Sequence, residues 1–128
     1  MLGRVWAVML NKDILRTAYA YLNETEPFVK WNLPDADDVD FSVKDSKKHA
    51  AKCHPPECTQ SGRYLIEVAE RHHEGTLNLM ETMAHEMVHI HEFQACIPRT
   101  NGKHLHGKVF KAYAKQVCEA HGFDIAQF

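Results

Sequence analysis

The sequence has 128 residues, 45% of them hydrophobic, and a formal net charge of -2, which suits one small globular domain with a single core. It is too short for two cores and shows neither an internal repeat nor an extended low-complexity linker. The first ten residues are apolar, but only Arg4 precedes the apolar run and no small-residue cleavage pattern follows it. We therefore expect a packed N-terminal extension rather than a signal peptide or a membrane span, and a monomer in a cytoplasmic, nucleoid or nuclear location.

The hydrophobic pattern predicts an α+β domain that begins with a helix at about residues 12–23, followed by an acidic loop. Three short strands come next and should form a small mixed or antiparallel sheet, and two helices follow them. The predicted strands are 39–43, 48–53 and 63–69, and the predicted helices are 77–94 and 108–121, the last ending at Gly122. We expect an edge of the sheet to lie beside helix 77–94, with a core spanning about residues 12–122.

Helix 77–94 is predicted to be buried along most of its length, with one polar stripe. Asn78 and Glu81 have the spacing of a capping box at its start. His91 falls in the apolar sector, which favours a packed histidine. The apolar sector spans about half of the helical wheel and contains Leu77, Leu79, Met80, Met83, Ala84, Met87, Val88 and Ile90.

His85, Glu86 and His89 form a His-Glu-x-x-His run within this helix. Residues four apart lie one turn above each other, so the two histidines can hold one metal ion from the same side. Glu86 lies about 100° round the helix from His85 and therefore flanks the metal face, where a base for a metal-activated water should stand. The run predicts half of a zinc site together with its catalytic carboxylate.

The third ligand defines the class of zinc site. The metzincin continuation needs glycine and histidine where this chain has Glu92 and Ala95, so that class is excluded. A glutamate ligand would have to be Glu119, the only glutamate after Glu92. The other candidates are His104 and, preferred, His106, which precedes helix 108–121, whose N-terminus helps to keep an imidazole neutral.

Segments along most of the chain match one known family. They are Leu22-Asn23-Glu24, Leu33-Pro34, residues 39–42, 48–53, 64–68 and 80–89, and the His-Gly-x-x-Phe element of residues 106–110. In this order, over roughly residues 14–120, the chain resembles SprT-like (Spartan-type) metallopeptidase domains. The resemblance implies a minimal zincin with one Zn²⁺ per chain, held by His85, His89 and His106, and with Glu86 catalytic.

The same resemblance implies an endopeptidase acting on protein or peptide substrates. Unlike many relatives, the sequence continues only briefly after its last helix, and we expect neither a zinc ribbon nor a DNA-binding tail, which leaves substrate targeting open. Two other classes also remain open. One is a non-catalytic zinc-binding adaptor in which Cys96 fills the fourth position, and the other is a zinc hydrolase of small amides or cell-wall peptides.

Charge is unevenly distributed along the chain. Residues 23–45 contain seven acidic residues and two lysines, whereas residues 99–118 contain five basic residues and no acid. Three of these, Lys108, Lys111 and Lys115, fall on one helical stripe. Spartan-type members cleave proteins crosslinked to DNA, so this stripe is a candidate DNA contact, although a solvated helix face is slightly favoured.

Several other residues carry weaker expectations. Glu81 and Glu92 are candidate partners of the ligand imidazoles, although solvated surface charges are favoured. Tyr64, His104 and Tyr113 are candidates for stabilising an oxyanion. The four cysteines lack a paired Cys-x-x-Cys spacing, so we expect free thiols, and a turn rather than a second metal site between Cys53 and Cys58.

Overall fold

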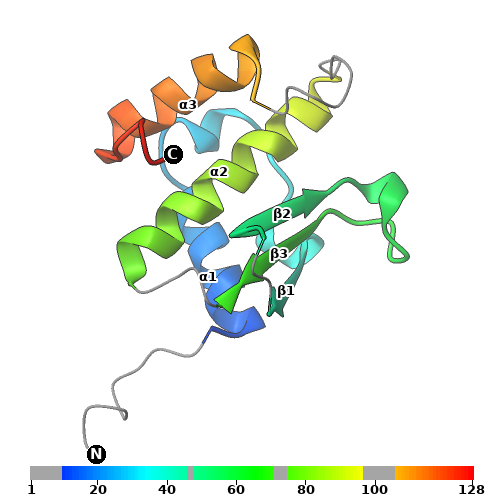
Figure 1. Cartoon of the computed structure of the whole chain (residues 1–128). Coiled ribbons are helices and arrows are strands. Elements are labelled where there is room, and N and C mark those ends of the chain that lie inside the picture. Colours follow the sequence, from blue (N-terminus) through cyan, green and yellow to red (C-terminus); the bar gives the residue numbers. More distant parts are fainter. Residues whose placement is uncertain (1–9, 46–47, 71–74, 97–105) are drawn as a thin grey trace, which may run out of the picture.

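The computed structural model describes residues 10–45, 48–70, 75–96 and 106–128, and the structural statements below concern these residues. The expected N-terminal extension, His104 and two of the basic residues, Arg99 and Lys103, lie outside them. The elements confirm the predicted α+β class: three α-helices and a three-stranded sheet, with short 3-10 turns between them (Figure 1).

The first helix is α1 (Lys12–Asn23), and both its start and its buried face agree with its sequence pattern. The side chain of Asn11 accepts a hydrogen bond of 2.9 Å from the Ile14 N–H and so satisfies one free donor of the first turn. The buried residues recur at helical spacing and form one face: Leu15, Ala18, Tyr19 and Leu22. This face packs against α2 and β1.

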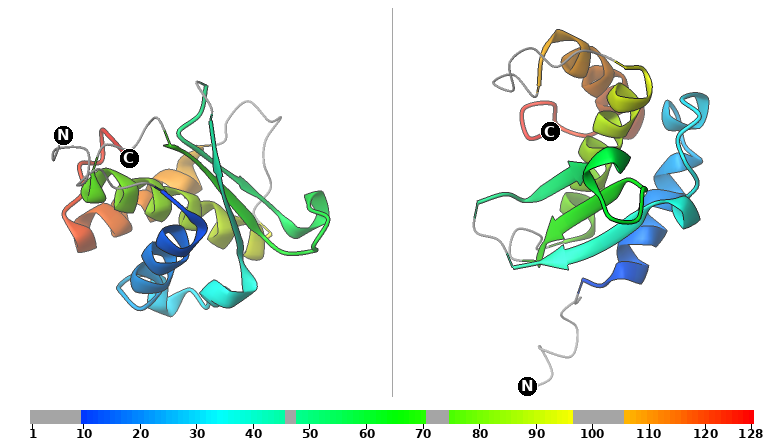
Figure 2. Two further views of the ribbon diagram at one scale, coloured as in Figure 1. Left: turned by 90° about the horizontal axis from the view of Figure 1, so that it is seen from below. Right: turned by 90° about the vertical axis from the view of Figure 1, so that its right-hand side faces the viewer.

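The sheet is mixed, with strand order β1-β3-β2. β1 (Asp40–Lys44) runs parallel to β3 (Leu65–Ala69), and β2 (Ala51–His54) runs antiparallel to β3. Ile66 and Val68 of the central strand are fully buried, because side chains alternate and these two face the helices. β2 is an edge strand and contacts α2, as predicted (Figure 2).

The helix α2 (Thr76–Gln94) lies between the sheet and α3, and contacts α1, β2 and α3 (Figures 1 and 2). Two details of its prediction are wrong. The helix begins one residue early with Gly75 as N-cap and no side-chain cap, so Asn78 is already inside the first turn and cannot serve in a capping box. Leu77 is 65% exposed because this first turn is not covered by the described core.

The last helix, α3 (Lys108–His121), packs its predicted face of Phe110, Ala114, Val117 and Cys118 into the core. Gly122 follows with φ 76°, a left-handed conformation that glycine adopts without steric cost, and its N–H closes the helix on the Cys118 carbonyl. Phe123 and Phe128 then fold back onto the core. None of the described helices is both long and apolar enough to span a membrane.

Candidate metal centre

Three imidazoles from two parts of the chain converge beside α2. His85 and His89 come from successive turns of α2, and His106 comes from just before α3. One nitrogen of each lies within 4.8 Å of the other two, and the Nε2 atoms of His85 and His106 are 3.0 Å apart. Nitrogens that share a tetrahedral zinc ion lie about 3.3 Å apart, since each Zn–N bond is about 2.05 Å. The cluster therefore has the donor type of a three-histidine metal site, and the His85–His106 pair is already close to the spacing that a shared ion requires.

The second nitrogens of the two helix histidines are held by acceptors. The Nδ1 of His85 donates to the main-chain oxygen of Phe128 at 2.5 Å, and the Nδ1 of His89 donates to Glu92 Oε1 at 3.1 Å. Because an acceptor at Nδ1 favours the tautomer with hydrogen there, the Nε2 lone pair of each ring is free to bind a metal ion. The preferred interpretation of Glu92 as a solvated surface charge is thus wrong, since its side chain is only 18% exposed and orients His89.

The cluster lies on an aromatic platform. The ring of Phe110, itself buried, is 4.8, 4.7 and 4.6 Å from the rings of His85, His89 and His106. Burial, and next the neighbouring His89, lower the pKa of His85 to about 4. His85 is therefore neutral at physiological pH, which is the form that ligates metal.

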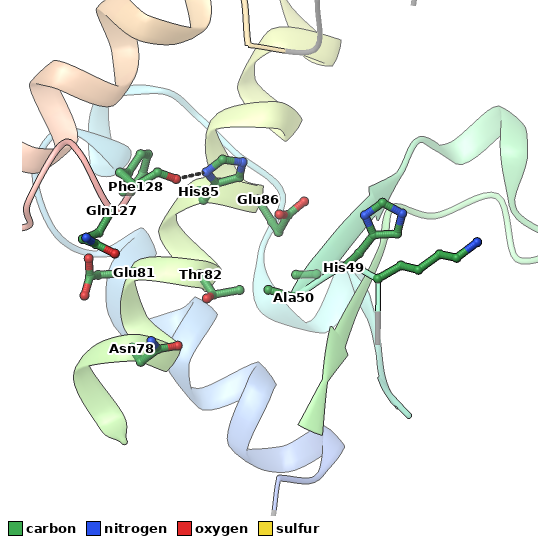
Figure 3. A pocket seen from close by; sticks show the side chains of 11 residues that line it. His49, Ala50, Asn78, Glu81, Thr82, His85, Glu86, Gln127 and Phe128 are labelled. Carbon is green, nitrogen blue, oxygen red and sulfur yellow. Dashed lines mark hydrogen bonds between the residues drawn. The ribbon is translucent and has the colours of Figure 1, made fainter. Parts of the chain in front are cut away.

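Glu86 is the buried acid of this region, with 5% of its surface exposed. Burial raises the pKa of its carboxyl group to about 8. Figure 3 shows its side chain turned from α2 toward the side of β2, next to His85. A carboxyl group held beside a metal site and poised near neutral pH is suited to act as a general base.

The polar side of α2 forms the floor of an open cavity of about 370 Å³. Residues of β2 and the segment before it stand on one side, and Gln127 and Phe128 stand on the other (Figure 3). The complete lining is Lys48, His49, Ala50, Ala51, Asn78, Glu81, Thr82, His85, Glu86, Gln127 and Phe128. One residue of the cluster, His85, and the neighbouring Glu86 thus face a space that can hold a ligand.

A sequence model of the SprT-like family matches residues 18–127, nearly the whole chain. The chain belongs to the SprT-like family. This match confirms the family resemblance seen in the sequence. Zinc metallopeptidase character is the general property of that family. No curated protein matches the chain.

The other candidate ligand and the candidate oxyanion-stabilising tyrosines lie outside the histidine cluster and the cavity. Glu119 is 68% exposed beside Lys115 and outside the histidine cluster, so the glutamate-ligand alternative has no support here. Tyr113 packs against Trp31 and His91, and Tyr64 lies against Phe93. Neither tyrosine lines the cavity.

The predictions of a packed His91 and of a turn between Cys53 and Cys58 are confirmed. His91 stacks on Trp31 with ring centroids 4.2 Å apart, as expected for a packed histidine. None of the four cysteines forms a disulfide, and the stretch between Cys53 and Cys58 is the predicted turn, with a 3-10 helix at Pro56–Cys58. The described residues contain one group of three potential ligands that could share a metal ion, and it includes no cysteine.

Sequence reasoning missed the C-terminal residues of the SprT-like site. Phe128 contacts His85, and Gln127 lines the cavity. No periodicity or motif spacing indicates these contacts, because they depend on the chain turning back after Gly122. The family match is the one sequence signal, since it extends to residue 127.

Proposed function

We propose that this SprT-like domain is a zinc-dependent endopeptidase in which His85, His89 and His106 hold one Zn²⁺ and Glu86 is the general base. The observation that supports it most is the convergence of three imidazoles beside a buried carboxyl group that faces an open cavity. Structural zinc sites are closed by four protein ligands, whereas three histidines leave a position for water and substrate.

When bound, zinc supplies Lewis acidity that polarises a peptide carbonyl and activates water near neutral pH. Glu86 then takes a proton from the attacking water and passes it to the departing amine. A cation held by the neighbouring histidines favours the carboxylate form of Glu86, which opposes the effect of burial on its pKa. Glu92 and the Phe128 oxygen keep two of the ligands in their metal-binding tautomers.

The edge strand β2 offers a place for an extended peptide substrate. One side of β2 is paired with β3, and Ala50 and Ala51 line the cavity beside Glu86. A peptide that added to the free edge would present its main chain to the metal centre, with little dependence on its side chains. A small domain could thereby accept many protein substrates.

The same histidines could instead hold zinc in a non-catalytic adaptor. That role would have used Cys96 as fourth ligand, but Cys96 is exposed and does not belong to the histidine cluster. The endopeptidase is therefore the better-supported function. A hydrolase of small amides or cell-wall peptides shares its chemistry and differs in its substrate.

One experiment tests the proposal: zinc analysis of wild type, His106→Ala and Glu86→Gln beside cleavage of casein, histone and muropeptide, with and without DNA. We expect one zinc ion per wild-type chain, weaker zinc binding in His106→Ala, and zinc retained with cleavage lost in Glu86→Gln. Zinc binding without any cleavage, unchanged in Glu86→Gln, would favour the adaptor. Cleavage of muropeptide alone would favour the small-substrate hydrolase.

We further propose that α3 contacts DNA. Lys108, Lys111 and Lys115 are all exposed on this helix, and Lys115 also lies 3.9 Å from Glu119. Lysines that neutralise phosphates release counterions, so binding of this kind weakens steeply with salt.

The DNA contact predicts that changing the three lysines to glutamate abolishes binding to single-stranded DNA at low salt. Fluorescence anisotropy of a labelled oligonucleotide over a salt series measures this. The exposed residues Lys12 and Lys30, changed to glutamate together, provide a charge control that should lose much less affinity. Absence of wild-type binding at every salt concentration would end the idea.

A further inference from the structure

We infer that the turn formed by residues 124–128 is a positioning element of the metal centre, which orients His85 for the metal ion and forms one wall of the substrate cleft. The cleft role rests on the proposed function. The orienting role concerns metal binding alone and can be tested without any activity.

Phe128 holds His85 by two kinds of contact. Its main-chain oxygen accepts the 2.5 Å hydrogen bond from His85 Nδ1, and its ring centroid is 5.4 Å from the imidazole. The phenyl ring also lies 6.4 Å from Phe110 and 6.2 Å from Phe123. The hydrogen bond fixes the tautomer of His85, and the ring contacts fix where the oxygen lies.

Asp124 determines the path of the turn. Its Oδ1 accepts a hydrogen bond of 3.0 Å from the Ala126 N–H. Its carbonyl oxygen accepts from the N–H groups of Gln127 and Phe128 at 2.9 and 3.1 Å. A side chain that bonds its own backbone two residues on stabilises a tight turn. Asp124 is exposed and touches no ligand, so its influence on His85 passes through Phe128.

The turn also bounds the cavity on one side. Gln127 and Phe128 stand across the floor of α2 from Ala50 of the β2 side (Figure 3). A peptide added to the edge of β2 would therefore pass with this turn on its other flank. A loosened turn would widen the cleft and weaken peptide binding, which raises KM more than it lowers kcat.

A turn that served only to cover the core would behave differently. Its loosening would lower thermal stability but leave the zinc affinity and the His85 tautomer unchanged. Zinc affinity, measured by competition with a chromogenic chelator, therefore separates the two roles. ¹⁵N NMR of the imidazoles in the metal-free protein reports the tautomer independently.

The first test compares Asp124→Ala with Asp124→Asn and Ile125→Ala. Asp124→Ala removes the side-chain bond of the turn but no core atom, and we expect about tenfold weaker zinc binding, typical of losing a partner behind a ligand. Asparagine keeps the acceptor oxygen and should restore wild-type affinity. Ile125 is in the same turn, 54% exposed and outside the cavity lining, so its alanine variant should bind zinc as wild type does.

Phe128→Ala is the second variant, and it should weaken zinc binding at least as much while shifting His85 toward a mixture of tautomers. Zinc affinity within twofold of wild type in both Asp124→Ala and Phe128→Ala would overturn the inference. Weakened zinc binding in a protein that cleaves no substrate would support the orienting role and count against the proposed endopeptidase. Cleavage by wild type, together with unchanged zinc affinity in both variants, would support the proposed endopeptidase and count against the orienting role.

Discussion

Glu86 combines a proposed role that needs a charged carboxylate with a buried location that opposes charge. Its carboxyl group is 5% exposed, and burial raises its pKa to about 8 from an ordinary value of 4.5. Such a group destabilises the fold when it ionises, and enzymes accept that cost where a base with a pKa near neutral is needed. The cost should therefore be measurable in the metal-free protein.

We predict that metal-free Glu86→Gln is more stable than metal-free wild type, by an amount that grows with pH. The folded wild type binds more protons than the unfolded chain between its two pKa values, so its stability falls as pH rises from about 4.5 to about 8. Glutamine has no charge to bury. At about 1.4 kcal/mol per pKa unit, the rise from 4.5 to about 8 makes the difference on the order of 4 kcal/mol at pH 8.

Urea unfolding in the presence of a chelator, at pH 5 to 8, measures this difference. His85, whose lowered pKa gives stability that is lost as pH falls below its ordinary value of 6.5, is common to both proteins and cancels in the difference. Glu81→Gln, at a partly exposed position one turn before His85, serves as the control for removing a carboxyl group from the same helix. Parallel stability curves for wild type and Glu86→Gln would contradict the prediction.

At the scale of single residues, the sequence predicts well those features that follow from a local repeat. The spacing of His85, Glu86 and His89 requires only a helix, and the helix is strongly marked by its apolar pattern. The contacts of Phe128 and Glu92 depend on rotamers and on a chain reversal that spacing does not encode. Sequence reasoning therefore predicted the convergent histidines, named Glu92 as a partner only as the less favoured alternative, and missed Phe128.

Among the elements, β2 is the one whose backbone the proposed peptide binding would use. The Ala69 N–H donates to the Ala50 oxygen at 2.8 Å, so Ala50 belongs to a hydrogen-bonded pair with β3. Antiparallel pairs alternate, which directs the main-chain groups of Ala51 away from β3, toward the edge of β2 that no described strand covers. Ala51 is thus the residue of β2 that both lines the cavity and offers free main-chain groups.

We predict that Ala51→Pro lowers kcat/KM for an unstructured peptide by about tenfold while zinc content stays at wild-type level. Proline removes the free-edge N–H and places its ring where the substrate strand would lie, but it spares the pairing with β3. Loss of one hydrogen bond with added steric conflict accounts for a change of this size. Peptide cleavage and zinc analysis of the same preparation give the two readouts.

Val43→Pro is the matched control, because Val43 and Ala51 both pair with Val68 of β3, on opposite edges of the sheet. It should cost similar sheet stability and leave kcat/KM close to wild type. Equal losses in the two variants would mean that cleavage responds to sheet stability, and strand addition would be rejected.

Element boundaries show where sequence information is weakest. The strands were predicted at 39–43, 48–53 and 63–69 but lie at Asp40–Lys44, Ala51–His54 and Leu65–Ala69. Helices carry a repeat of many residues and end at specific capping residues such as Gly122, whereas a strand of four or five residues carries barely two repeats. Its ends are decided by partners in the sheet, which local sequence does not reveal.

For the whole molecule, the three-histidine cluster brings together parts that are separate along the chain. His89 and His106 are seventeen residues apart in sequence, and they come from α2 and from the segment leading into α3. A ligand that binds only the folded arrangement stabilises it by RT ln(1 + L/Kd), where L is the free ligand concentration. Zinc should therefore stabilise the contact between α2 and the segment leading into α3, in addition to its proposed role as a cofactor.

We predict that zinc at about a thousandfold excess over its Kd stabilises the domain by about 4 kcal/mol. For a domain of this length that raises Tm by roughly 15 °C, since each kcal/mol shifts Tm by about 4 °C. His106→Ala removes the ligand that joins the α3 side to α2, so it should lose most of this increase. Differential scanning calorimetry with zinc and with chelator measures both effects.

His91→Ala distinguishes stabilisation by bound zinc from a general effect of removing a histidine. His91 stacks on Trp31 and is not part of the metal cluster, so this variant should melt at a lower temperature yet keep the full response to zinc. The two histidine variants should thus separate a loss of thermal stability from a loss of the zinc-induced rise in Tm. A role of His106 in packing alone would not produce the second effect. If wild type melts at the same temperature with zinc and with chelator, the three imidazoles do not act together as a metal site, and the endopeptidase proposal would fail with them.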